Sequence, residues 1–235
     1  MVPLPIRYIE LENVYAQTFG NEARSVAVTA PQGGEGVSTL AYALARRAAA
    51  ASKNTLLVDM NLARPSIAGR FGLQSKEWSP EGDSSGKATE TFPSIFLSIL
   101  PAPKRAHSWA FRDARTLREC IERWTEKYDF VVIDTSPINR ANQGNIPPDL
   151  VCAESDMTVL VALSGRTTES QVIEARSRLV AVGARLAGGI MNDRYMPHLA
   201  DELCRETYRL ERWFPKLMKT LRLQIRRSSL LNQEL

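Results

Sequence analysis

The sequence predicts an α/β fold, in which one domain is built on a doubly wound, mostly parallel sheet flanked by helices. Short apolar runs rich in β-branched residues alternate with segments of helical periodicity, which is typical of parallel strands joined by crossover helices. A chain of 235 residues that is 44% hydrophobic can bury one substantial core. We therefore expect an N-terminal helix at 1–21, the domain at 22–195 and a C-terminal tail at 196–235.

These patterns predict six strands and five helices. Apolar runs place strands near 25–30, 55–59, 95–100, 130–134, 157–163 and 185–191. Helical periodicity places helices near 7–19, 37–51, 114–127, 169–182 and from 199 onward. The segment 74–91 is rich in Ser, Gly, Lys and Glu and has few apolar residues, so we expect a mobile surface loop there.

Charge and cysteine content limit the classes of protein to consider. The net charge is +4 and the isoelectric point is about 9.1, so the chain is mildly basic and nucleic acid is not an expected partner. The three cysteines are far apart and lack metal-ligand spacing. No apolar run approaches the roughly 18 residues of a membrane span, and no signal-peptide pattern opens the chain. We therefore expect reduced thiols in a cytoplasmic protein.

A glycine-rich loop follows the first expected strand. Residues 26–30 form an apolar run, residues 31–36 read Pro-Gln-Gly-Gly-Glu-Gly, and a helix-prone segment follows. In this strand–loop–helix order, backbone N–H groups and the helix N-terminus cradle phosphate. The usual pattern ends in Gly-Lys-[Ser/Thr], but Val37 stands at the lysine position and Pro31 replaces the first glycine. The expected phosphate-binding residues are Gly33, Gly34, Glu35, Gly36, Val37, Ser38 and Thr39.

Polar residues also stand at the ends of three expected strands. Asp59, Asp134 and Asn192 each come at the end of an apolar run or directly after it. Ligands of open parallel sheets bind outside the carboxyl ends of the strands. We therefore expect these three side chains and the glycine-rich loop to form one site.

Two further segments, taken with this loop, resemble the motifs of a known family. Residues 56–66 (LLVDMNLARPS) and 128–137 (YDFVVIDTSP) are similar to Walker A′ and Walker B of the bacterial tyrosine kinases, or BY-kinases. That family lies within the MinD/ParA-like P-loop NTPases. Residues 165–168 (GRTT) and 188–193 (GGIMND) also match the family pattern. The resemblance covers about residues 22–195 and depends on the order and spacing of the motifs together.

The resemblance implies a nucleotide ligand and a role for several residues. ATP or ADP with Mg²⁺ would be the cofactor. Ser38 and Asp134 would hold the metal or its water, and Asp59 would lie near the γ-phosphate as a metal ligand or base. Thr39 would lie near the α-phosphate, and Asn192 would contact adenine.

The chain departs from the family pattern at three positions. Val37 removes the cation that stabilises the transferring phosphoryl group, a loss of roughly 3–4 kcal/mol, or about 10²–10³ in rate, by analogy with an oxyanion-hole donor. Asn61 replaces the second carboxylate of Walker A′, and Gln32 replaces an additional lysine of MinD/ParA relatives. We therefore expect Asp59, Asn61 and Asp134 to be vestiges of a catalytic site.

Nucleotide binding need not vanish with catalysis. The backbone N–H groups of residues 34–39 and the helix dipole remain, and a charged hydrogen bond contributes about 1.5–3 kcal/mol. Loss of the lysine therefore weakens binding by roughly 10–100-fold, which leaves weak binding or none as the two expectations. Arg64 and Lys53 are the cations that we consider as substitutes for the lysine.

Two other features of BY-kinases are missing. The resemblance implies a C-terminal tyrosine cluster that neighbouring subunits phosphorylate, but the tail holds only Tyr195 and Tyr208. It also implies Glu-x-x-Arg-x-x-Arg on the N-terminal helix for ring assembly, whereas residues 12–18 carry Glu, Tyr and Thr at those positions. Autophosphorylation and a ring oligomer are therefore not expected.

The C-terminal tail has the pattern of a basic amphipathic helix. Its apolar residues repeat at helical spacing with lysine and arginine between them: Leu210, Trp213, Phe214, Leu217, Met218, Leu221 and Ile225. Pro215 suits the first turn of a helix that ends near Arg227. Such a helix can lie on an anionic membrane, dock on a partner or pack on its own domain. All three remain open for the stretch 210–227.

The favoured interpretation is a catalytically degenerate BY-kinase-like protein that acts as an accessory or regulatory subunit of a bacterial exopolysaccharide or capsule synthesis and export system. The resemblance implies a membrane-embedded polysaccharide co-polymerase or another synthase subunit as partner. Recruitment from the cytoplasm to the inner face of the membrane would follow, and a homodimer is a further expectation. Two alternatives are an active ATPase or tyrosine autokinase with a non-standard cation, and a MinD/ParA-type positioning protein for a surface or secretion apparatus.

Overall fold

The computed structural model describes residues 8–62, 64–104, 109–140, 144–193, 207–208, 211 and 215–227. The chain forms two compact units, Met1–Asn192 and Asp193–Leu235. The sheet, the helices that cover it and the candidate site all belong to the first unit.

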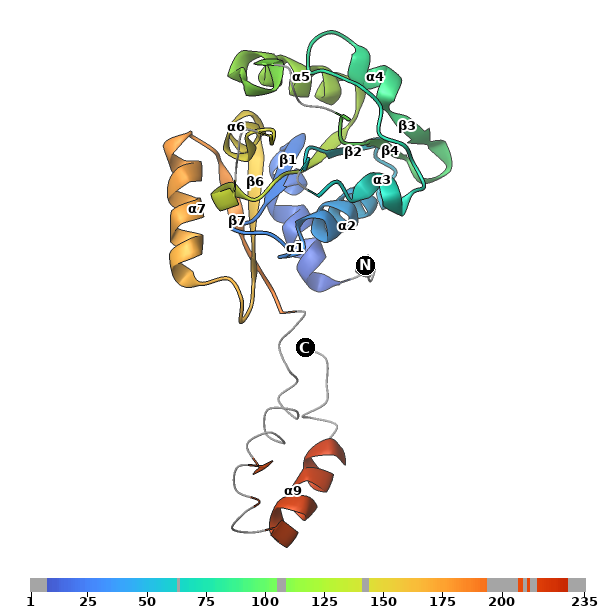
Figure 1. The fold of residues 1–235 in the computed structure, drawn as a ribbon. Helices are drawn as coiled ribbons and strands as arrows, with labels where there is room; N and C mark the ends of the chain where they lie inside the picture. Colours follow the sequence, from blue (N-terminus) through green and yellow to red (C-terminus); the bar gives the residue numbers. More distant parts are fainter. Residues whose placement is uncertain are drawn as a thin grey trace. The chain divides into compact units, whose positions relative to one another are not determined.

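A seven-stranded sheet lies at the centre of the first unit among the described residues (Figure 1). Its strands are β1 (Ser25–Thr29), β2 (Thr55–Asp59), β3 (Glu90–Phe92), β4 (Leu97–Leu100), β5 (Phe130–Asp134), β6 (Met157–Leu163) and β7 (Leu186–Asn192). They lie in the order β3-β4-β2-β5-β1-β6-β7. Neighbouring strands are parallel except for β3 and β4. The predicted doubly wound, mostly parallel α/β fold is confirmed.

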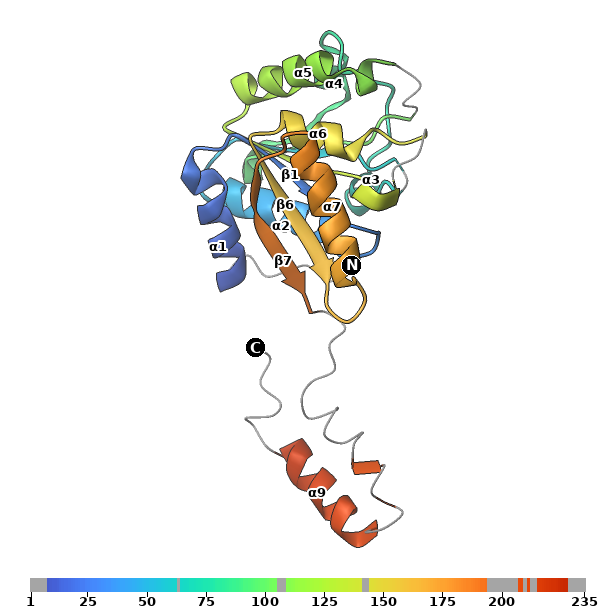
Figure 2. The ribbon, with the colours of Figure 1, turned by 90° about the vertical axis from the view of Figure 1, so that its left-hand side faces the viewer.

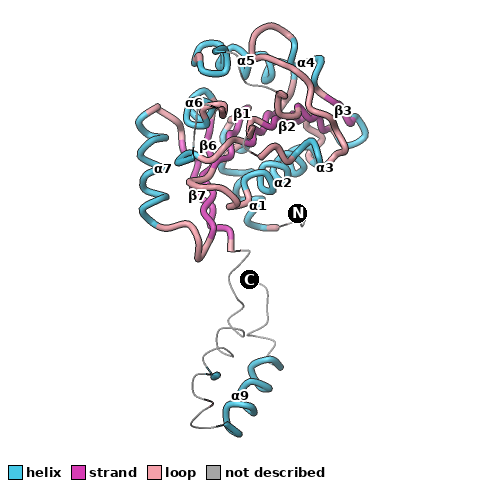
Figure 3. Tube along the Cα trace, in the orientation of Figure 1, coloured by secondary structure: helices cyan, strands magenta, loops and turns pink. Residues whose placement is uncertain are grey.

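Helices cover both faces of this sheet. The helices α1 (Ile9–Gln17) and α2 (Val37–Ala50) pack on one face, while α5 (Ala114–Lys127), α6 (Pro148–Glu154) and α7 (Glu169–Ala181) pack on the other. Figure 2 shows α7 running along β6, and Figure 3 shows the magenta strands as the layer between the cyan helices. Two short helices, α3 (Ile67–Arg70) and α4 (Ser84–Ala88), lie between β2 and β3 in the chain. Short 3₁₀ turns occupy 19–21, 93–95, 109–112 and 138–140.

The core on each face follows from the alternation of side chains along the strands. Val26 and Val28 of β1 belong to the apolar cluster under α2, whereas Ala27 between them belongs to the cluster under α7. Both faces of the central strands are therefore buried, which explains why these strands appear in the sequence as nearly continuous apolar runs.

Two of the helices start at clear capping signals. The Asp113 side chain accepts a hydrogen bond from the Thr116 backbone N–H at 2.8 Å and so caps α5. Thr168 and Gln171 form a capping box at the start of α7. The buried residues of α5 recur at i, i+3, i+4 and i+7, the spacing of one helix face: Leu117, Cys120, Ile121 and Trp124.

The first helix is fixed to α2 by an ion pair. Arg47 Nη2 donates to Glu12 Oε2 at 2.7 Å, and the Arg47 guanidinium carbon lies 4.3 Å from the centre of the Tyr15 ring. The Thr18 hydroxyl donates to the Val14 carbonyl at 2.7 Å and ends the helix. The Glu12 carboxylate is thus engaged within its own domain.

The segment 74–91 is not the surface loop that the sequence predicts. It contains α4 and the start of β3, and Trp78 is buried. The indole Nε1 of Trp78 donates to the Pro101 carbonyl at 2.8 Å. Its ring packs edge-on against Phe111 and Trp124, with centroids 5.3 and 6.1 Å away. The prediction is wrong because it relied on the average composition of the segment, which is polar. A few buried side chains, such as Trp78, hold the segment on the domain.

Several strand boundaries differ from the prediction by one or two residues. Pro93–Ile95 form a 3₁₀ turn and Phe96 has a φ of 53°, so β4 begins at Leu97. At the other edge of the sheet, β7 runs as far as Asn192. The short helices α3, α4 and α6 have no counterpart in the prediction, because segments of this length show too little periodicity.

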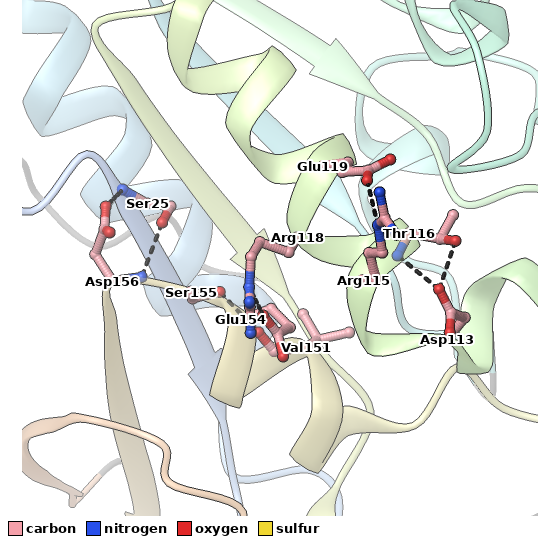
Figure 4. A network of polar contacts seen from close by, with 10 residues as sticks. All are labelled: Ser25, Asp113, Arg115, Thr116, Arg118, Glu119, Val151, Glu154, Ser155 and Asp156. Carbon is pink, nitrogen blue, oxygen red and sulfur yellow. Dashed lines mark hydrogen bonds and ion pairs between the residues drawn. The ribbon is translucent and has the colours of Figure 1, made fainter.

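A network of polar contacts joins the amino ends of β1 and β6 to α5 and α6 (Figure 4). Asp156 Oδ2 accepts from the Ser25 backbone N–H at 2.8 Å, and Ser25 Oγ accepts from the Asp156 backbone N–H at 2.9 Å. Arg118 Nε donates to Glu154 Oε2 at 2.7 Å and so links α5 to α6. These contacts lie at the end of the sheet opposite the glycine-rich loop.

Two of the three cysteines lie within the described residues, and both are unpaired. Cys120 and Cys152 are buried, and burial raises the pKa of each thiol to about 12. Neither is therefore a reactive thiolate near neutral pH. Cys204 lies outside the described residues.

In the second unit, the helix α9 (Pro215–Arg227) has the bounds that the sequence predicts. Leu221 and Leu223 on it are exposed. No described helix is both long enough and apolar enough to cross a bilayer. The predicted tail residues Tyr195, Leu210, Trp213 and Phe214 lie outside the described residues.

Candidate functional site

The glycine-rich loop joins β1 to α2 at the carboxyl end of the sheet. Gly34 and Gly36 have φ angles of 94° and 101°, a left-handed backbone that favours glycine. Gly36 is the residue that precedes the first turn of α2. The first N–H groups of a helix have no partner inside it, so those of Val37, Ser38 and Thr39 can serve a ligand. The loop therefore has the backbone of an anion-binding turn.

The loop is held from inside by Glu35. This residue is buried, and its Oε1 accepts hydrogen bonds from the Gln32 backbone N–H at 2.8 Å and the Thr167 hydroxyl at 3.4 Å. Asn192 Nδ2, at the end of β7, donates to the Glu35 carbonyl at 2.7 Å. The structure thus places Asn192 against the loop, as expected for a shared site, while its contact with adenine stays a prediction.

Replacement of Gly36 tests this packing. A Cβ atom built on Gly36 would lie 2.6 Å from Asn192 Nδ2, whereas one built on Gly34 meets nothing within 4 Å. We expect Gly34→Ala to lower the free energy of unfolding by about 1–2 kcal/mol through backbone strain alone, and Gly36→Ala to lower it further. Thermal unfolding of both variants, and of Gly36→Ala combined with Asn192→Ala, measures the difference. Equal losses for the two single variants would contradict the proposed clash.

Asp59 and Asp134 stand side by side in the sheet. They are register partners at the ends of β2 and β5, and both are fully buried. Asp59 accepts three backbone N–H bonds, from Asn61 at 3.0 Å, Ser66 at 3.1 Å and Ile67 at 3.2 Å. Neither oxygen of Asp134 has a hydrogen-bond partner of good geometry among the described residues. One carboxylate is thus fixed by the backbone, and the other is free to bind a ligand.

This environment changes the acidity of both groups. Burial raises the pKa of Asp59 to about 6, although its three backbone N–H donors lower it in part. Burial also raises the pKa of Asp134 well above its ordinary value, and the negative charge of Asp59 raises it further. The Ser38 hydroxyl acts in the opposite direction on Asp134. Two adjacent carboxyl groups without a cation are therefore poorly compensated as anions.

The residues present fit a magnesium ion that arrives with a nucleotide. Mg²⁺ is usually bound through one or two carboxylates, with waters and substrate phosphates as its other ligands. The unpartnered Asp134 oxygens, with the Ser38 hydroxyl beside them, match that donor set. Among the described residues, no group of three or more His, Cys, Asp and Glu side chains is arranged to hold a metal ion.

Asn61 has a structural position in the turn after β2. Its Oδ1 accepts from the Arg64 backbone N–H at 3.1 Å and from Ser136 Oγ at 3.3 Å. The amide thus ties the turn after β2 to the segment after β5. A side chain that holds two turns in this way is a positioning group, and a neutral amide cannot act as a base.

Val37 and Ser38 lie at the start of α2. Val37 is buried in the apolar cluster of the α1 and α2 face. Next to it, a hollow of about 290 Å³ is lined by Ser38, Tyr42, Ser66, Ile67, Arg70 and Phe71. The Arg70 guanidinium carbon lies 4.0 Å from the centre of the Tyr42 ring in this hollow. The position of the missing lysine is therefore part of the core.

Comparison with known proteins agrees with the resemblance that the motifs indicate. No protein-family model matches the chain. The tyrosine-protein kinase YwqD of Bacillus subtilis is 27% identical over 187 residues, which are 77% of each chain. The tyrosine-protein kinase CpsD of Streptococcus pneumoniae is 24% identical over 182 residues, 75% of this chain and 78% of that protein. Over about three quarters of its length, the chain is similar to bacterial tyrosine kinases.

Solved structures share the fold of this chain. The chimeric protein CapA2B2 has a TM-score of 0.68 at 22% identity and covers 78% of this chain and 83% of its own. The kinase domain of the Escherichia coli tyrosine kinase ETK has a TM-score of 0.65 at 21% identity, with 80% and 73% covered. The septum site-determining protein MinD of Pyrococcus horikoshii, in complex with Mg-ADP, has a TM-score of 0.59 at 20% identity, with 74% and 71% covered. The predicted BY-kinase and MinD/ParA-like recognition is confirmed, while the roles of single residues stay predictions.

The structure separates the cations considered as substitutes for the lysine. Lys53 precedes β2 at its amino end, so it lies at the end of the sheet opposite the glycine-rich loop and is not placed to substitute for the lysine. Arg64 follows β2 at the carboxyl end and is exposed. A cation that the sequence pattern does not indicate is Arg140, whose Nε donates to Gln32 Oε1 of the loop at 2.8 Å. Its position in the turn that follows the Asp134 strand is the signal that could have found it.

Proposed function

We propose that this BY-kinase relative binds a magnesium nucleotide but transfers phosphoryl groups poorly or not at all. One observation carries the proposal: Asp134 is fully buried, and neither of its oxygens has a partner of good geometry among the described residues. An unpartnered buried carboxylate is costly, so its retention favours a cation ligand. Bound magnesium would neutralise charge between this carboxylate and the phosphates. Val37 and Asn61 supply neither the cation nor the second carboxylate that phosphoryl transfer calls for.

In the cell, this site belongs to an accessory or regulatory subunit of a bacterial exopolysaccharide or capsule synthesis and export system. The likeness to BY-kinases supports that assignment. The chain would be cytoplasmic and recruited to the inner face of the membrane by a polysaccharide co-polymerase or another synthase subunit. Residues 210–227 would contribute to that contact, and a homodimer is the proposed assembly.

Calorimetric titration with Mg·ATP and Mg·ADP tests the nucleotide site. We expect the unmodified protein to bind both, and Val37→Lys to bind them roughly 10–100-fold more tightly, because a charged hydrogen bond contributes about 1.5–3 kcal/mol. Val37→Ala is the control, since it removes the same core contact without adding charge. A thermal unfolding curve for each variant shows whether the buried substitution leaves the fold intact.

The outcomes separate this proposal from catalysis. No binding by the unmodified protein, with binding restored by lysine, would mean that the scaffold has lost its ligand. ATP hydrolysis or autophosphorylation that disappears in Asp134→Ala would instead establish the active enzyme, with a cation other than the usual lysine.

Genetic experiments test the pathway. Deletion of the gene should reduce surface polysaccharide, and normal secretion in a clean deletion strain would contradict the assignment. Removal of residues 210–235 should release the protein from a membrane fraction. Polar localisation that is lost in the same truncation, with polysaccharide unchanged, would favour the MinD/ParA-type positioning alternative.

A further inference from the structure

The turn after β5 packs directly against the glycine-rich loop. The Ile138 N–H donates to the Ala30 carbonyl at 2.9 Å, and the Asn139 N–H donates to the Pro31 carbonyl at 3.0 Å. A Cβ atom built on Gly33 would lie 3.4 Å from the Pro137 side chain. Successive residues of this turn therefore contact successive residues of the loop. The side chain of the next residue in the turn begins beside the loop.

Arg140 is that next residue, and its side chain turns to the loop. Arg140 Nε donates to Gln32 Oε1 at 2.8 Å. The Gln32 backbone N–H donates in turn to the buried Glu35 carboxylate at 2.8 Å. The guanidinium is thus anchored to the same residue that fixes the shape of the loop.

The anchor leaves the outer part of the guanidinium available. Arg140 is exposed, and its two terminal nitrogens donate to no acceptor among the described residues. A guanidinium stays charged at all relevant pH values, and its planar fork of N–H donors matches the oxygens of a phosphate. The nearby carboxylates Glu35, Asp59 and Asp134 would otherwise repel an anionic ligand.

We propose that Arg140 supplies the cation for the outer phosphates of a bound nucleotide, in the role left vacant by Val37. The proposal rests on the nucleotide binding proposed above. It adds the residue that allows such binding without a lysine. It differs from a purely structural role, in which Arg140 would only brace Gln32. A phosphate contact depends on the number of phosphates in the ligand, and bracing does not.

Calorimetric titration of the full chain with Mg·ATP, Mg·ADP, AMP and adenosine tests the assignment. We expect Arg140→Ala to weaken binding of Mg·ATP and Mg·ADP by roughly 10–100-fold and to leave AMP and adenosine within about threefold. Arg140→Lys should restore part of the affinity, since it keeps the charge. Arg185→Ala is the matched control, because it removes an exposed arginine that precedes β7 at the amino end of the sheet.

A double-variant comparison separates replacement of the lysine from other effects. In a Val37→Lys background, the loss caused by Arg140→Ala should shrink to about threefold or less, because the lysine now serves the phosphates. An equal loss in both backgrounds would show that Arg140 does not fill the vacant role. Gln32→Ala tests whether the shape of the loop has changed. Equal weakening of adenosine and ATP binding by this variant would indicate such a change.

The results also distinguish this inference from the proposed function. If the unmodified protein binds none of the nucleotides, the proposed function fails. If it binds Mg·ATP and Arg140→Ala binds equally well, nucleotide binding stands and the inference about Arg140 is overturned. Arg64→Ala and Arg166→Ala, tested in the same series, would then show whether another arginine at this end of the sheet serves instead.

Discussion

Asp134→Asn should stabilise the nucleotide-free protein by about 3 kcal/mol at pH 7, the scale of one uncompensated buried charge. The carboxylate is fully buried, and an amide in its place breaks no hydrogen bond of good geometry among the described residues. For a domain of this size, that change corresponds to a rise in melting temperature of roughly 6–12 °C. The same variant should lose the stabilisation that Mg·ATP or Mg·ADP confers.

The gain should depend on pH in a defined direction. Burial raises the pKa of Asp59 from 3.8 to about 6, and that of Asp134 is raised well above 3.8. Between 3.8 and the raised value, the folded chain holds a proton that the unfolded chain has released. The stability of the unmodified protein therefore falls as pH rises through this window. The difference between Asp134→Asn and the unmodified protein should be small near pH 4 and should grow towards pH 7.

Denaturant unfolding at a series of pH values measures this difference. Asp193→Asn is the control, because Asp193 is exposed and its replacement removes the same formal charge without relieving burial. A stability difference that stays constant from pH 4 to pH 7 would show that Asp134 titrates normally in the folded chain. A loss of stability at pH 7 would mean that the carboxylate has a stabilising partner.

Trp78→Ala should lower the free energy of unfolding by about 3–5 kcal/mol, the typical cost of removing a large buried aromatic side chain. The indole fills the space between Phe111 and Trp124, and its N–H bonds the Pro101 carbonyl. Its loss would leave a cavity and an unpaired carbonyl beneath α4. The measurement is urea unfolding followed by circular dichroism.

Trp109→Ala provides the matched control for this prediction. The Trp109 side chain is 84% exposed, so its removal should change stability by less than about 0.5 kcal/mol. Similar losses for the two tryptophan variants would contradict the burial of Trp78. Trp78→Phe, which keeps an aromatic ring but removes the N–H, would separate the packing contribution from the hydrogen bond.

The sequence predicts most of the parallel sheet because its central strands are buried on both faces. Residues 55–59, 130–134 and 157–163 are expected as strands and occur with those bounds. Their continuous apolar runs leave little ambiguity. By contrast, β3 pairs antiparallel at the edge of the sheet and consists of Glu90, Thr91 and Phe92, so it has neither an apolar run nor the length that reveals a strand.

The sequence predicts where the candidate site lies, but it predicts only some of the contacts within the site. The expectation that Asp59, Asp134 and Asn192 meet at the loop follows from parallel topology, since all three end their strands at the same edge. The bonds of Glu35 to Thr167 and of Gln32 to Arg140 join residues far apart in the chain. A single sequence holds no spacing rule for such pairs, because the turns that bring them together have no fixed length.

Asn192 is both the final residue of β7 and the point at which the chain leaves the first unit. Its amide is also the donor that holds the Glu35 carbonyl of the glycine-rich loop. A force applied to the C-terminal segment reaches β7 at this residue before any other in the sheet. Fraying of the strand end by a single residue would withdraw the donor from the loop. The shape of the glycine-rich loop is therefore connected to the carboxyl end of β7 through the Asn192 side chain.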